Sequence, residues 1–427
     1  MDRRTFLKTT GAAVAAAPFL TAQPGATQIQ HVVVCMLENR SFDHLFGWLP
    51  NASGRQAGLS YVDTEGNSHA TFPLASDFTG CDYDDPDHSY SGGRLEYDNG
   101  KMDGFLQPAS NSVYAIGYYQ EKDLPFRAAL ARNYTTCDRY FPSILGPTFP
   151  NRIFQYAGQT DRLDDDLSIC TLPTIWDNLQ AKGVSHKYYF NNLPIVALWG
   201  LKYLSIANYY SDFLSDCAAG TLPSVSFVDP SFTLIENLAE DDHPHSDVRN
   251  GDAFLAQTFQ AVSSGPNWPN TVFIVNFDEW GGFFDTIVPP RAIAPNGVDT
   301  DLVDGKALLG IRVPCIIASP WTRGNPADPA VNSTVFDHTS VLKLIETIWD
   351  VPPLAARETS TDVGNLLSVL NPNNYDAAVP TLPSPRHVIP SSFCSSSLTS
   401  APITGDREPT VFQKMIENGM LAGFPGY

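Results

Sequence analysis

The sequence is short of basic side chains. Its 26 lysines and arginines stand against 46 aspartates and glutamates, so the formal net charge is -20 at pH 7. Binding to the phosphate backbone of a nucleic acid requires clustered positive charge, and this composition therefore argues against a nucleic-acid partner. An anionic membrane surface would also repel the chain, whereas zwitterionic groups and small anions stay open if a cation offsets the acidic charge locally.

Cysteine is sparse and unclustered. The seven cysteines are spread along the chain and none forms a Cys-x-x-Cys pair, which argues against a zinc ribbon and against thioredoxin-like redox chemistry. Cys35 and Cys315 lie in apolar runs, where a buried free thiol is the ordinary outcome. The odd number leaves at least one thiol free, and the other cysteines could form one or two disulfides.

Internal repeats are absent, and beyond the N-terminus no apolar run is long enough to span a membrane. The N-terminus carries Arg3-Arg4 followed by a small and apolar run that ends at Ala22, the layout of a twin-arginine export signal. We expect cleavage between Ala22 and Ala26, export by the twin-arginine machinery, and a periplasmic, cell-surface or secreted protein without a transmembrane anchor. The alternative interpretation is a cytoplasmic N-terminal helix.

The pattern of apolar runs predicts an α/β protein. Short apolar runs bounded by turn residues alternate with helix-like stretches, as expected of a mainly parallel sheet covered on both faces. The expected strands are His31 to Leu37, Val184 to Phe190, Ser224 to Val228, Thr271 to Phe277 and Arg312 to Ala318. The expected helices are Ile175 to Lys182, Gly251 to Ser263 and Ser340 to Trp349. Residues 50–130 are richer in turn formers and predict an extended loop region over the sheet, which would be a lid or a pocket wall.

Two acidic groups follow expected strands. Glu38 and Asn39 come directly after the first strand, and Asp278 and Glu279 come directly after the fourth. Ligands bind outside the carboxyl ends of parallel strands, so these side chains could meet at one site. Carboxylates and an amide oxygen suit one hard divalent cation such as calcium, magnesium or manganese, and zinc remains open. Taken singly, each group could equally be a helix cap or a turn.

Three further residues are candidates for chemistry. Thr148 lies where a turn feeds a helix, so its hydroxyl would stand beside the free N–H groups that bind an anion, although an ordinary helix cap explains it too. His88 and His243 are flanked by aspartates, which favour a proton on the ring and hence a general acid, although surface histidines are commoner. His338 opens an expected helix and is left out of the site.

Several ordered segments together resemble the phosphoesterase family of bacterial non-haemolytic phospholipases C, plant non-specific phospholipases C and related acid phosphatases. They span roughly residues 30 to 350. The segments are Glu38-Asn39-Arg40-Ser41-Phe42-Asp43-His44, Asp87-His88-Ser89, Met102-Asp103-Gly104-Phe105, Pro147-Thr148-Phe149-Pro150-Asn151-Arg152, Asp242-His243-Pro244, Phe277-Asp278-Glu279, Gly281-Gly282-Phe283-Phe284-Asp285, Arg312-Val313-Pro314 and Asp337-His338-Thr339-Ser340.

The resemblance implies an alkaline-phosphatase-like three-layer sandwich and an enzyme that hydrolyses phosphoric esters. Thr148 would be the nucleophile and form a phosphothreonine intermediate, and His88 and His243 would contact the phosphate or the leaving group. The metal ligands would be Glu38, Asn39, Asp278 and Glu279. Residues 1–26 would be the signal peptide, 27–380 the catalytic domain and 381–427 a tail with a short helix.

One departure from the family concerns Thr286. The family commonly has histidine at this position, after the paired glycines and Phe284-Asp285, so any part played by that histidine is missing or taken over elsewhere. The segments do not separate a phospholipase C-like diesterase acting on phospholipid from an acid phosphatase acting on small monoesters. A third hypothesis is a catalytically inactive extracytoplasmic binding protein.

Overall fold

A computed structural model describes residues 29–232, 239–389 and 408–427. An eight-stranded sheet forms its centre, in the order β16-β6-β15-β11-β1-β10-β8-β9. Neighbouring strands run parallel except at β15, which is antiparallel to both β11 and β6. The expected α/β architecture with a mainly parallel sheet is confirmed. The predicted export signal lies outside the described residues.

The strands of this sheet match the apolar runs of the sequence. β1 and β11 have the expected bounds. β8 is two residues shorter than the predicted strand and β10 one residue shorter, and β15 covers only the second half of the predicted strand Arg312 to Ala318. Both β1 and β11 are buried along their whole length, as strands covered on two faces must be. The bounds are β1 His31–Leu37, β6 Thr135–Cys137, β8 His186–Phe190, β9 Ala207–Tyr209, β10 Val225–Val228, β11 Thr271–Phe277, β15 Cys315–Ala318 and β16 Val331–Asn332.

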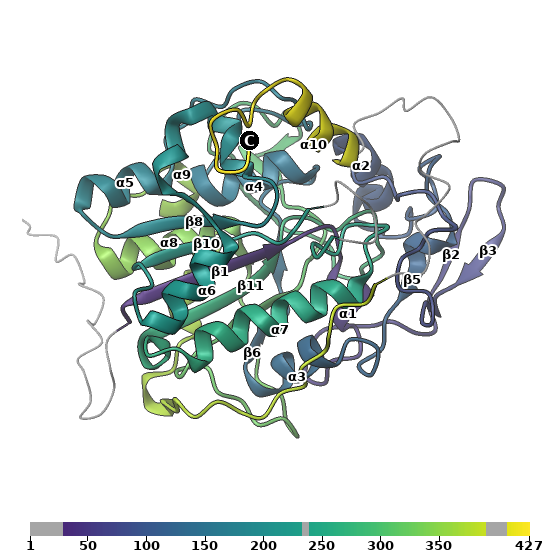
Figure 1. The fold of residues 1–427 in the computed structure, drawn as a ribbon. Helices are drawn as coiled ribbons and strands as arrows, with labels where there is room; N and C mark the ends of the chain where they lie inside the picture. The colour runs from purple at the N-terminus through teal and green to yellow at the C-terminus, as the bar shows by residue number, and fades with distance from the viewer. Residues whose placement is uncertain (1–28, 233–238, 390–407) are drawn as a thin grey trace, which may run out of the picture.

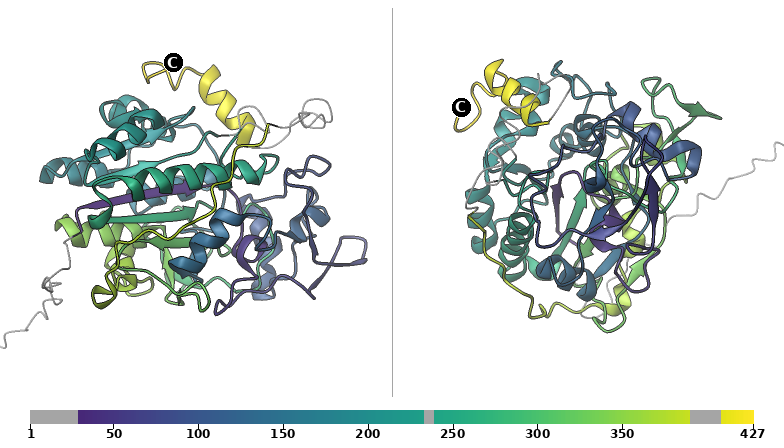
Figure 2. Two further views of the ribbon diagram at one scale, coloured as in Figure 1. Left: turned by 60° about the horizontal axis from the view of Figure 1, so that its bottom comes forward. Right: turned by 90° about the vertical axis from the view of Figure 1, so that its right-hand side faces the viewer.

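Helices cover the sheet in two groups, which gives the molecule three layers (Figures 1 and 2). In one group α3 and α6 each contact α7, and the other group contains α4, α5, α8 and α9. Their bounds are α3 Pro125–Asn133, α4 Thr148–Ala157, α5 Ile175–Lys182, α6 Tyr210–Ala219, α7 Val248–Ser264, α8 His338–Trp349 and α9 Ala356–Thr359. The predicted helices at α5, α7 and α8 are confirmed.

Residues 50–130 lie beyond the carboxyl end of β1, at the right of Figure 1. They are more structured than the composition indicates, because α2 is a two-turn helix and α3 packs against α7 as part of the helical layer. The elements here, with the short helix before them, are α1 Phe42–Phe46, β2 Ser60–Val62, β3 Ser68–Ala70, β4 Phe72–Pro73, α2 Tyr90–Tyr97 and β5 Gly117–Tyr118. The remaining small strands are β7 Tyr140–Phe141, β12 Arg291–Ile293, β13 Leu302–Val303, β14 Lys306–Leu308 and β17 Phe336–Asp337.

The C-terminal helix α10, Glu408–Glu417, docks on the molecule. Its Phe412 is buried, and the ring centroid lies 6.1 Å from that of Phe149 at the start of α4 and 5.2 Å from that of Phe232. Cys35 and Cys315 are buried free thiols, as expected, while Cys81 is disulfide-bonded.

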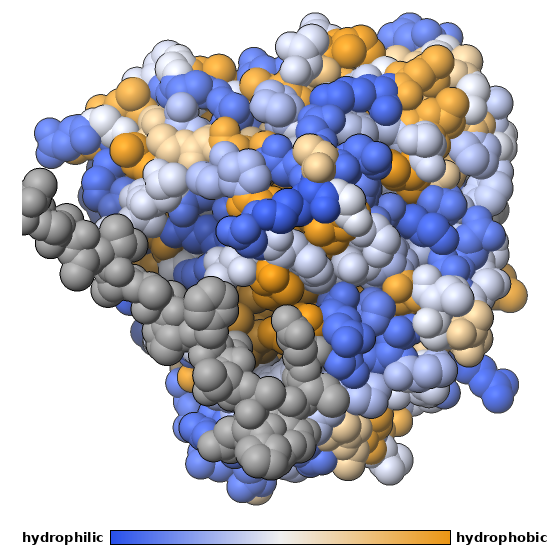
Figure 3. Space-filling model, turned by 90° about the vertical axis from the view of Figure 1, so that its left-hand side faces the viewer, coloured by the Kyte–Doolittle hydropathy of each residue, from blue (hydrophilic) through white to orange (hydrophobic). Residues whose placement is uncertain are grey.

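The face at the amino ends of the strands mixes hydrophilic and apolar side chains (Figure 3). Within the described ranges, every helix is too short or too polar to cross a bilayer. The residues of interest gather at the opposite end of the sheet, where β1, β10 and β11 finish.

Candidate active site

Three neighbouring strands end in acidic side chains. Glu38 and Asn39 follow β1, Asp229 follows β10, and Asp278 and Glu279 follow β11. All five side chains are buried, with exposed fractions between 0 and 1%. Because β1, β10 and β11 are parallel neighbours, their carboxyl ends bring the five side chains to one edge of the sheet.

Arg152 joins three of these carboxylates. From the second turn of α4 its guanidinium contacts Glu38 at 2.9 Å, Asp229 at 3.1 Å and Asp278 at 3.2 Å. Burial disfavours the charged guanidinium, but the three carboxylates outweigh this effect and hold the pKa of Arg152 well above its usual value. Burial raises the pKa of Asp229, against the opposing effect of Arg152. The Arg152 guanidinium therefore stabilises three buried carboxylates.

Asn39 connects the strand ends. Its backbone adopts a left-handed conformation, with φ of 57°, and its amide donates to Asp278 at 3.1 Å. Gly281 makes this turn possible, because a Cβ atom there would lie 2.1 Å from the Asn39 carbonyl oxygen. Glu279 in turn accepts a hydrogen bond from the Gly281 amide at 2.6 Å. These contacts fix Asn39, Asp278 and Glu279 relative to one another.

Thr148 is the first residue of α4, and the preceding cap position is Pro147. The threonine hydroxyl donates to the Asn39 side-chain oxygen at 3.4 Å and is fully buried. It therefore does not cap its own helix, in contrast to the alternative interpretation from sequence. The next amide, of Phe149, donates to Asp165 at 2.7 Å, so one of the N–H groups at this helix start already has an anionic partner.

The two expected histidines lie together on the other side of Asn39. Nε2 of His88 is 3.4 Å from the Asn39 side-chain nitrogen, and the ring centroids of His88 and His243 are 5.9 Å apart. Nε2 of His243 faces Asp85 at 3.6 Å. The structure thus brings all seven expected residues into one connected group, although a distant aspartate, rather than the flanking ones, faces the His243 ring.

The flanking aspartates instead hold the backbone of His243. Asp241 accepts from the His243 amide at 3.1 Å, and Asp242 forms a buried pair with Arg127 at 2.7 Å. Asp242 is left-handed, with φ of 79°, and packs so closely on α7 that a Cβ atom at Gly251 would lie 2.0 Å from its carboxylate. These contacts place the imidazole.

His338, which the sequence left outside the site, lies directly behind Asp278. Its Nε2 is 2.7 Å from the Asp278 carbonyl oxygen and its Nδ1 is 3.1 Å from the Tyr140 hydroxyl. Burial lowers the pKa of His338 to about 4, so the ring is neutral at pH 7. His338 is a positioning residue for the end of β11.

The donor set matches a divalent cation. Glu38, Asp278 and Glu279 supply carboxylates and Asn39 an amide oxygen, which are the donors that hard cations prefer. With Asp229 they form a set of four buried acidic side chains, three of which contact Arg152. A divalent cation among them would lower the cost of burying charge of one sign. A second candidate set, Asp85, His88 and His243, has its ligand atoms within 4.8 Å of one another.

Thr286, where the family commonly has histidine, contacts the start of α1. Its amide and its hydroxyl both donate to one carboxylate oxygen of Asp43. Asp43 and Asp285 are buried and share Arg312, at 2.9 and 3.1 Å. The threonine thus belongs to a neighbouring group of ion pairs.

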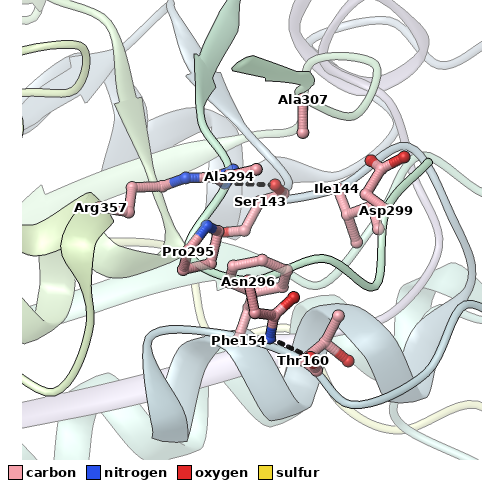
Figure 4. A pocket seen from close by; sticks show the side chains of 10 residues that line it. All are labelled: Ser143, Ile144, Phe154, Thr160, Ala294, Pro295, Asn296, Asp299, Ala307 and Arg357. Atoms are coloured by element: carbon pink, nitrogen blue, oxygen red, sulfur yellow. Dashed lines mark hydrogen bonds between the residues drawn. The ribbon is translucent and has the colours of Figure 1, made fainter. Parts of the chain in front are cut away.

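A small pocket lies apart from these residues (Figure 4). Arg357 in its wall donates to the Ser143 carbonyl, and Asn296 donates to that of Thr160 at 2.7 Å. Its lining contains none of the seven expected site residues: it consists of Ser143, Ile144, Phe154, Thr160, Ala294, Pro295, Asn296, Asp299, Ala307 and Arg357.

Comparisons with known proteins identify the family of this chain. A family model described as the Phosphoesterase family matches residues 29–352. Phospholipase C A of Mycobacterium tuberculosis is 32% identical over 87% of this chain and 85% of its own. Non-specific phospholipase C6 of Arabidopsis thaliana is 32% identical over 76% and 68%. The chain therefore belongs to the Phosphoesterase family and is a phosphoric ester hydrolase.

Solved structures are similar to this chain at lower sequence identity. One is a protein in the alkaline phosphatase superfamily from Vibrio parahaemolyticus, with 11% identity, a TM-score of 0.39, and coverage of 80% of this chain and 70% of that one.

Sequence reasoning missed three residues of this site. Asp229 follows a predicted strand as Glu38 and Asp278 do, so the same rule would have found it. Arg152 lies four residues after Thr148, on the same face of a helix, which was a usable signal. The sequence gave no signal for Asp85, because it approaches His243 only in the folded structure.

Proposed function

We propose that this protein is a metal-dependent, phospholipase C-like phosphoester hydrolase that acts through a phosphothreonine intermediate. The observation that carries the proposal is the contact between the Thr148 hydroxyl and Asn39, since it sets a buried hydroxyl beside a set of buried carboxylates with the donor types that a divalent cation prefers. A divalent ion held by Glu38, Asn39, Asp278 and Glu279 would supply Lewis-acid chemistry and favour the alkoxide of a nearby hydroxyl.

The residues of the chain have distinct parts in this mechanism. Thr148, fixed at the start of α4, attacks phosphorus and forms the phosphothreonine while the ester oxygen leaves. His88 and His243 line the other side of Asn39, so they would contact the phosphate or protonate the leaving alcohol. Arg152 and His338 hold Asp278 in place from two directions. Water then hydrolyses the intermediate with the same groups acting in reverse.

Phospholipid is the substrate that the relatives favour. The two relatives reported above are named phospholipases C, and the net charge of -20 favours a zwitterionic headgroup over an anionic membrane. An acid phosphatase acting on small monoesters is the second candidate, because one attack on phosphorus serves both ester types. An inactive binding protein is the third, and the intact contact of Thr148 with Asn39 speaks against it.

Metal removal tests the proposal directly. Purified protein should release diacylglycerol from phosphatidylcholine vesicles, lose this activity on chelation, and regain it with one of calcium, magnesium, manganese or zinc. An aryl phosphate assayed in parallel separates the two substrate classes. Full activity of metal-free protein would refute metal dependence, and inactivity on both substrates under all four ions would favour a binding protein.

We also propose export in the folded state by the twin-arginine route, with residues 27–380 as the catalytic domain and 381–427 as its tail. The supporting observation is Arg3-Arg4 before the apolar run. Replacing both arginines with lysine should retain the protein in the cytoplasm, measured by fractionation. Normal export of that variant would exclude this route.

A further inference from the structure

A chain of hydrogen bonds connects the interior of β11 to its end at the candidate site. It begins at Asn276, whose side-chain nitrogen lies 3.0 Å from the Tyr140 hydroxyl. This hydroxyl lies 3.1 Å from Nδ1 of His338, and Nε2 of His338 lies 2.7 Å from the Asp278 carbonyl oxygen. All four residues are fully buried. Because Asn276 lies in β11 and Asp278 directly follows it, these hydrogen bonds leave and rejoin the same stretch of backbone.

The direction of each hydrogen bond follows from the carbonyl at the end of the chain. A carbonyl oxygen only accepts, so Nε2 of His338 carries a proton and donates to Asp278. Burial lowers the pKa of His338 to about 4, so the ring is neutral at pH 7 and its Nδ1 accepts. Burial also raises the pKa of Tyr140, which keeps its proton and donates it to Nδ1. The Tyr140 oxygen in turn accepts from Asn276.

Asn276 is held in the orientation that this direction requires. Its side-chain nitrogen also donates to Oε1 of Gln155 in α4 at 2.7 Å, and the Gln155 nitrogen donates to the Met36 sulfur at 3.4 Å. A side-chain amide has two N–H donors, so Asn276 can donate to Tyr140 and to Gln155 at once. The hydrogen bonds therefore also connect β11 to α4, the helix that begins with Thr148.

The backbone holds Tyr140 and His338 close together. Tyr140 lies in β7, and His338 begins α8 directly after β17. The strands β7 and β17 pair in parallel, with Phe336 opposite Tyr140. Asp337 caps α8 and accepts from the Thr339 amide at 2.9 Å. Because the strand pairing and the helix cap already order both backbones, little conformational freedom is lost when the two side chains bond.

Asp278 is the residue that these hydrogen bonds position. Its Oδ1 accepts from the backbone amides of Asn39 at 3.1 Å and Glu279 at 2.7 Å. Its Oδ2 accepts from Arg152 at 3.2 Å. The hydrogen bond from His338 fixes the peptide group between Asp278 and Glu279, and both residues are expected metal ligands. Metal affinity depends on such supporting contacts, because they orient the ligands before the ion binds.

We propose that Tyr140 is a positioning residue for the metal ligands: through His338 it holds the peptide between Asp278 and Glu279 in the conformation that binds a divalent cation. Tyr140 acts only through His338 and needs no contact with the substrate. The effect of Tyr140 on turnover rests on the proposed hydrolase function. Its effect on the His338 ring does not depend on that function, and its effect on metal affinity requires only that the ion binds.

Nuclear magnetic resonance of the His338 ring tests the direction of the hydrogen bonds. Ring nitrogens with and without a proton give separate nitrogen signals, and the spectrum of His338→Gln identifies which signals belong to this ring. In the metal-free wild type at pH 7, Nε2 should carry the proton and Nδ1 should not. In Tyr140→Phe the Nδ1 signal should shift, because its donor is lost. A proton on Nδ1 in the wild type would overturn the proposal without any variant.

The affinity for manganese, measured by calorimetry on metal-free protein, separates positioning from stability. Tyr140→Phe should raise the Kd for manganese by about 10-fold. His338→Gln should bind manganese more tightly than His338→Leu, because glutamine keeps a donor for the Asp278 carbonyl and an acceptor for Tyr140. Tyr210→Phe is the matched control, since buried Tyr210 bonds Thr258 at 2.9 Å between α6 and α7. It should lose stability but keep the wild-type Kd and ring signals.

The outcomes distinguish this proposal from a structural role and from the hydrolase function. Unchanged ring signals and Kd in folded Tyr140→Phe would overturn it, and so would an equal rise of Kd in Tyr210→Phe. Circular dichroism checks folding, and the wild-type ring signals decide if Tyr140→Phe does not fold. The expected changes without turnover of any phosphoester would refute the hydrolase function alone. Metal-dependent turnover with an unchanged Kd in Tyr140→Phe would refute the positioning role alone.

Discussion

Two sets of buried acidic side chains, each with one arginine, differ in the contacts that surround them. The functional group contains Glu38, Asp229, Asp278 and Glu279 with Arg152. The structural group contains Asp43 and Asp285 with Arg312. Among the described residues, Arg152 contacts three of the four acidic side chains of the first group, and Arg312 contacts both acidic side chains of the second.

Hydrogen bonds complete the structural group. Each of the four carboxylate oxygens of Asp43 and Asp285 accepts two hydrogen bonds, from Arg312, from Thr286 and from backbone amides. A carboxylate that is satisfied in this way stabilises a fold and has no capacity left for a ligand. We therefore expect the supply of hydrogen-bond donors, and not burial or acidity alone, to separate a binding site from a structural ion pair.

The largest expected effect is on turnover, from Thr148→Ala in the functional group. The substitution removes the nucleophile but no helix cap, since Pro147 holds the cap position, so stability should hardly change. The value of kcat should fall by about 10³-fold or more, because only the contribution of the remaining site to water attack survives. Steady-state kinetics and thermal melting measure the two effects.

Thr148→Ser is the control, and it should retain more activity because it keeps a hydroxyl. Acid quenching followed by peptide mass spectrometry should locate the substrate phosphoryl group on residue 148 in the wild type. A label on another residue, or near-normal turnover of folded Thr148→Ala, would contradict the assignment.

Arg312→Met, in the structural group, should lower stability and leave metal binding unchanged. It leaves Asp43 and Asp285 buried without their cation, which should cost about 3 to 5 kcal/mol of unfolding free energy. Metal stoichiometry of the folded fraction should stay unchanged. Urea denaturation measures the stability, with Glu279→Gln as the counterpart that should lose metal and little stability. Equal stability of Arg312→Met and the wild type would refute the structural role of Arg312.

Much of the functional group was predictable because strand ends carry it. The apolar runs of β1 and β11 set their bounds residue for residue, so the positions of Glu38, Asn39, Asp278 and Glu279 followed. The reversal of β15 was not predictable, since a short buried run is apolar in either direction. The approach of Asp85 to His243 was not predictable either, because it depends on how two loops pack.

A third acidic pair should make stability depend on pH. Glu346 and Glu358 are buried near Lys343, and burial raises their pKa values to about 9 and about 7. A group whose pKa is raised by folding contributes stability below its unfolded value, near 4.5 for glutamate, and this is lost as pH rises through the folded value. This pair thus depends on bound protons, as does Asp285, whose pKa burial raises to about 7.

Unfolding free energy should therefore fall as pH rises from about 4.5 to about 7, by roughly 3 kcal/mol for the shift at Glu358. Glu358→Gln should flatten this part of the curve, because glutamine needs no proton to remain neutral. Urea denaturation at pH 5 and pH 8 measures the slope for both proteins. An equally steep fall in the variant would assign the pH dependence to other groups.

The smallest expected effect is that of Thr286→Val, which tests to which group this departure from the family belongs. The variant loses the hydroxyl contact to Asp43 and keeps the backbone amide contact, so it should lose only about 1 kcal/mol of unfolding free energy. Thr286→Ser keeps a hydroxyl, so its unfolding free energy should lie between those of the wild type and Thr286→Val. Metal stoichiometry and kcat should match the wild type, because Thr286 contacts the structural group. A loss of bound metal or of kcat with unchanged stability would instead place residue 286 in the functional group, and the distinction drawn from donor balance would then fail at the position where this chain differs from its family.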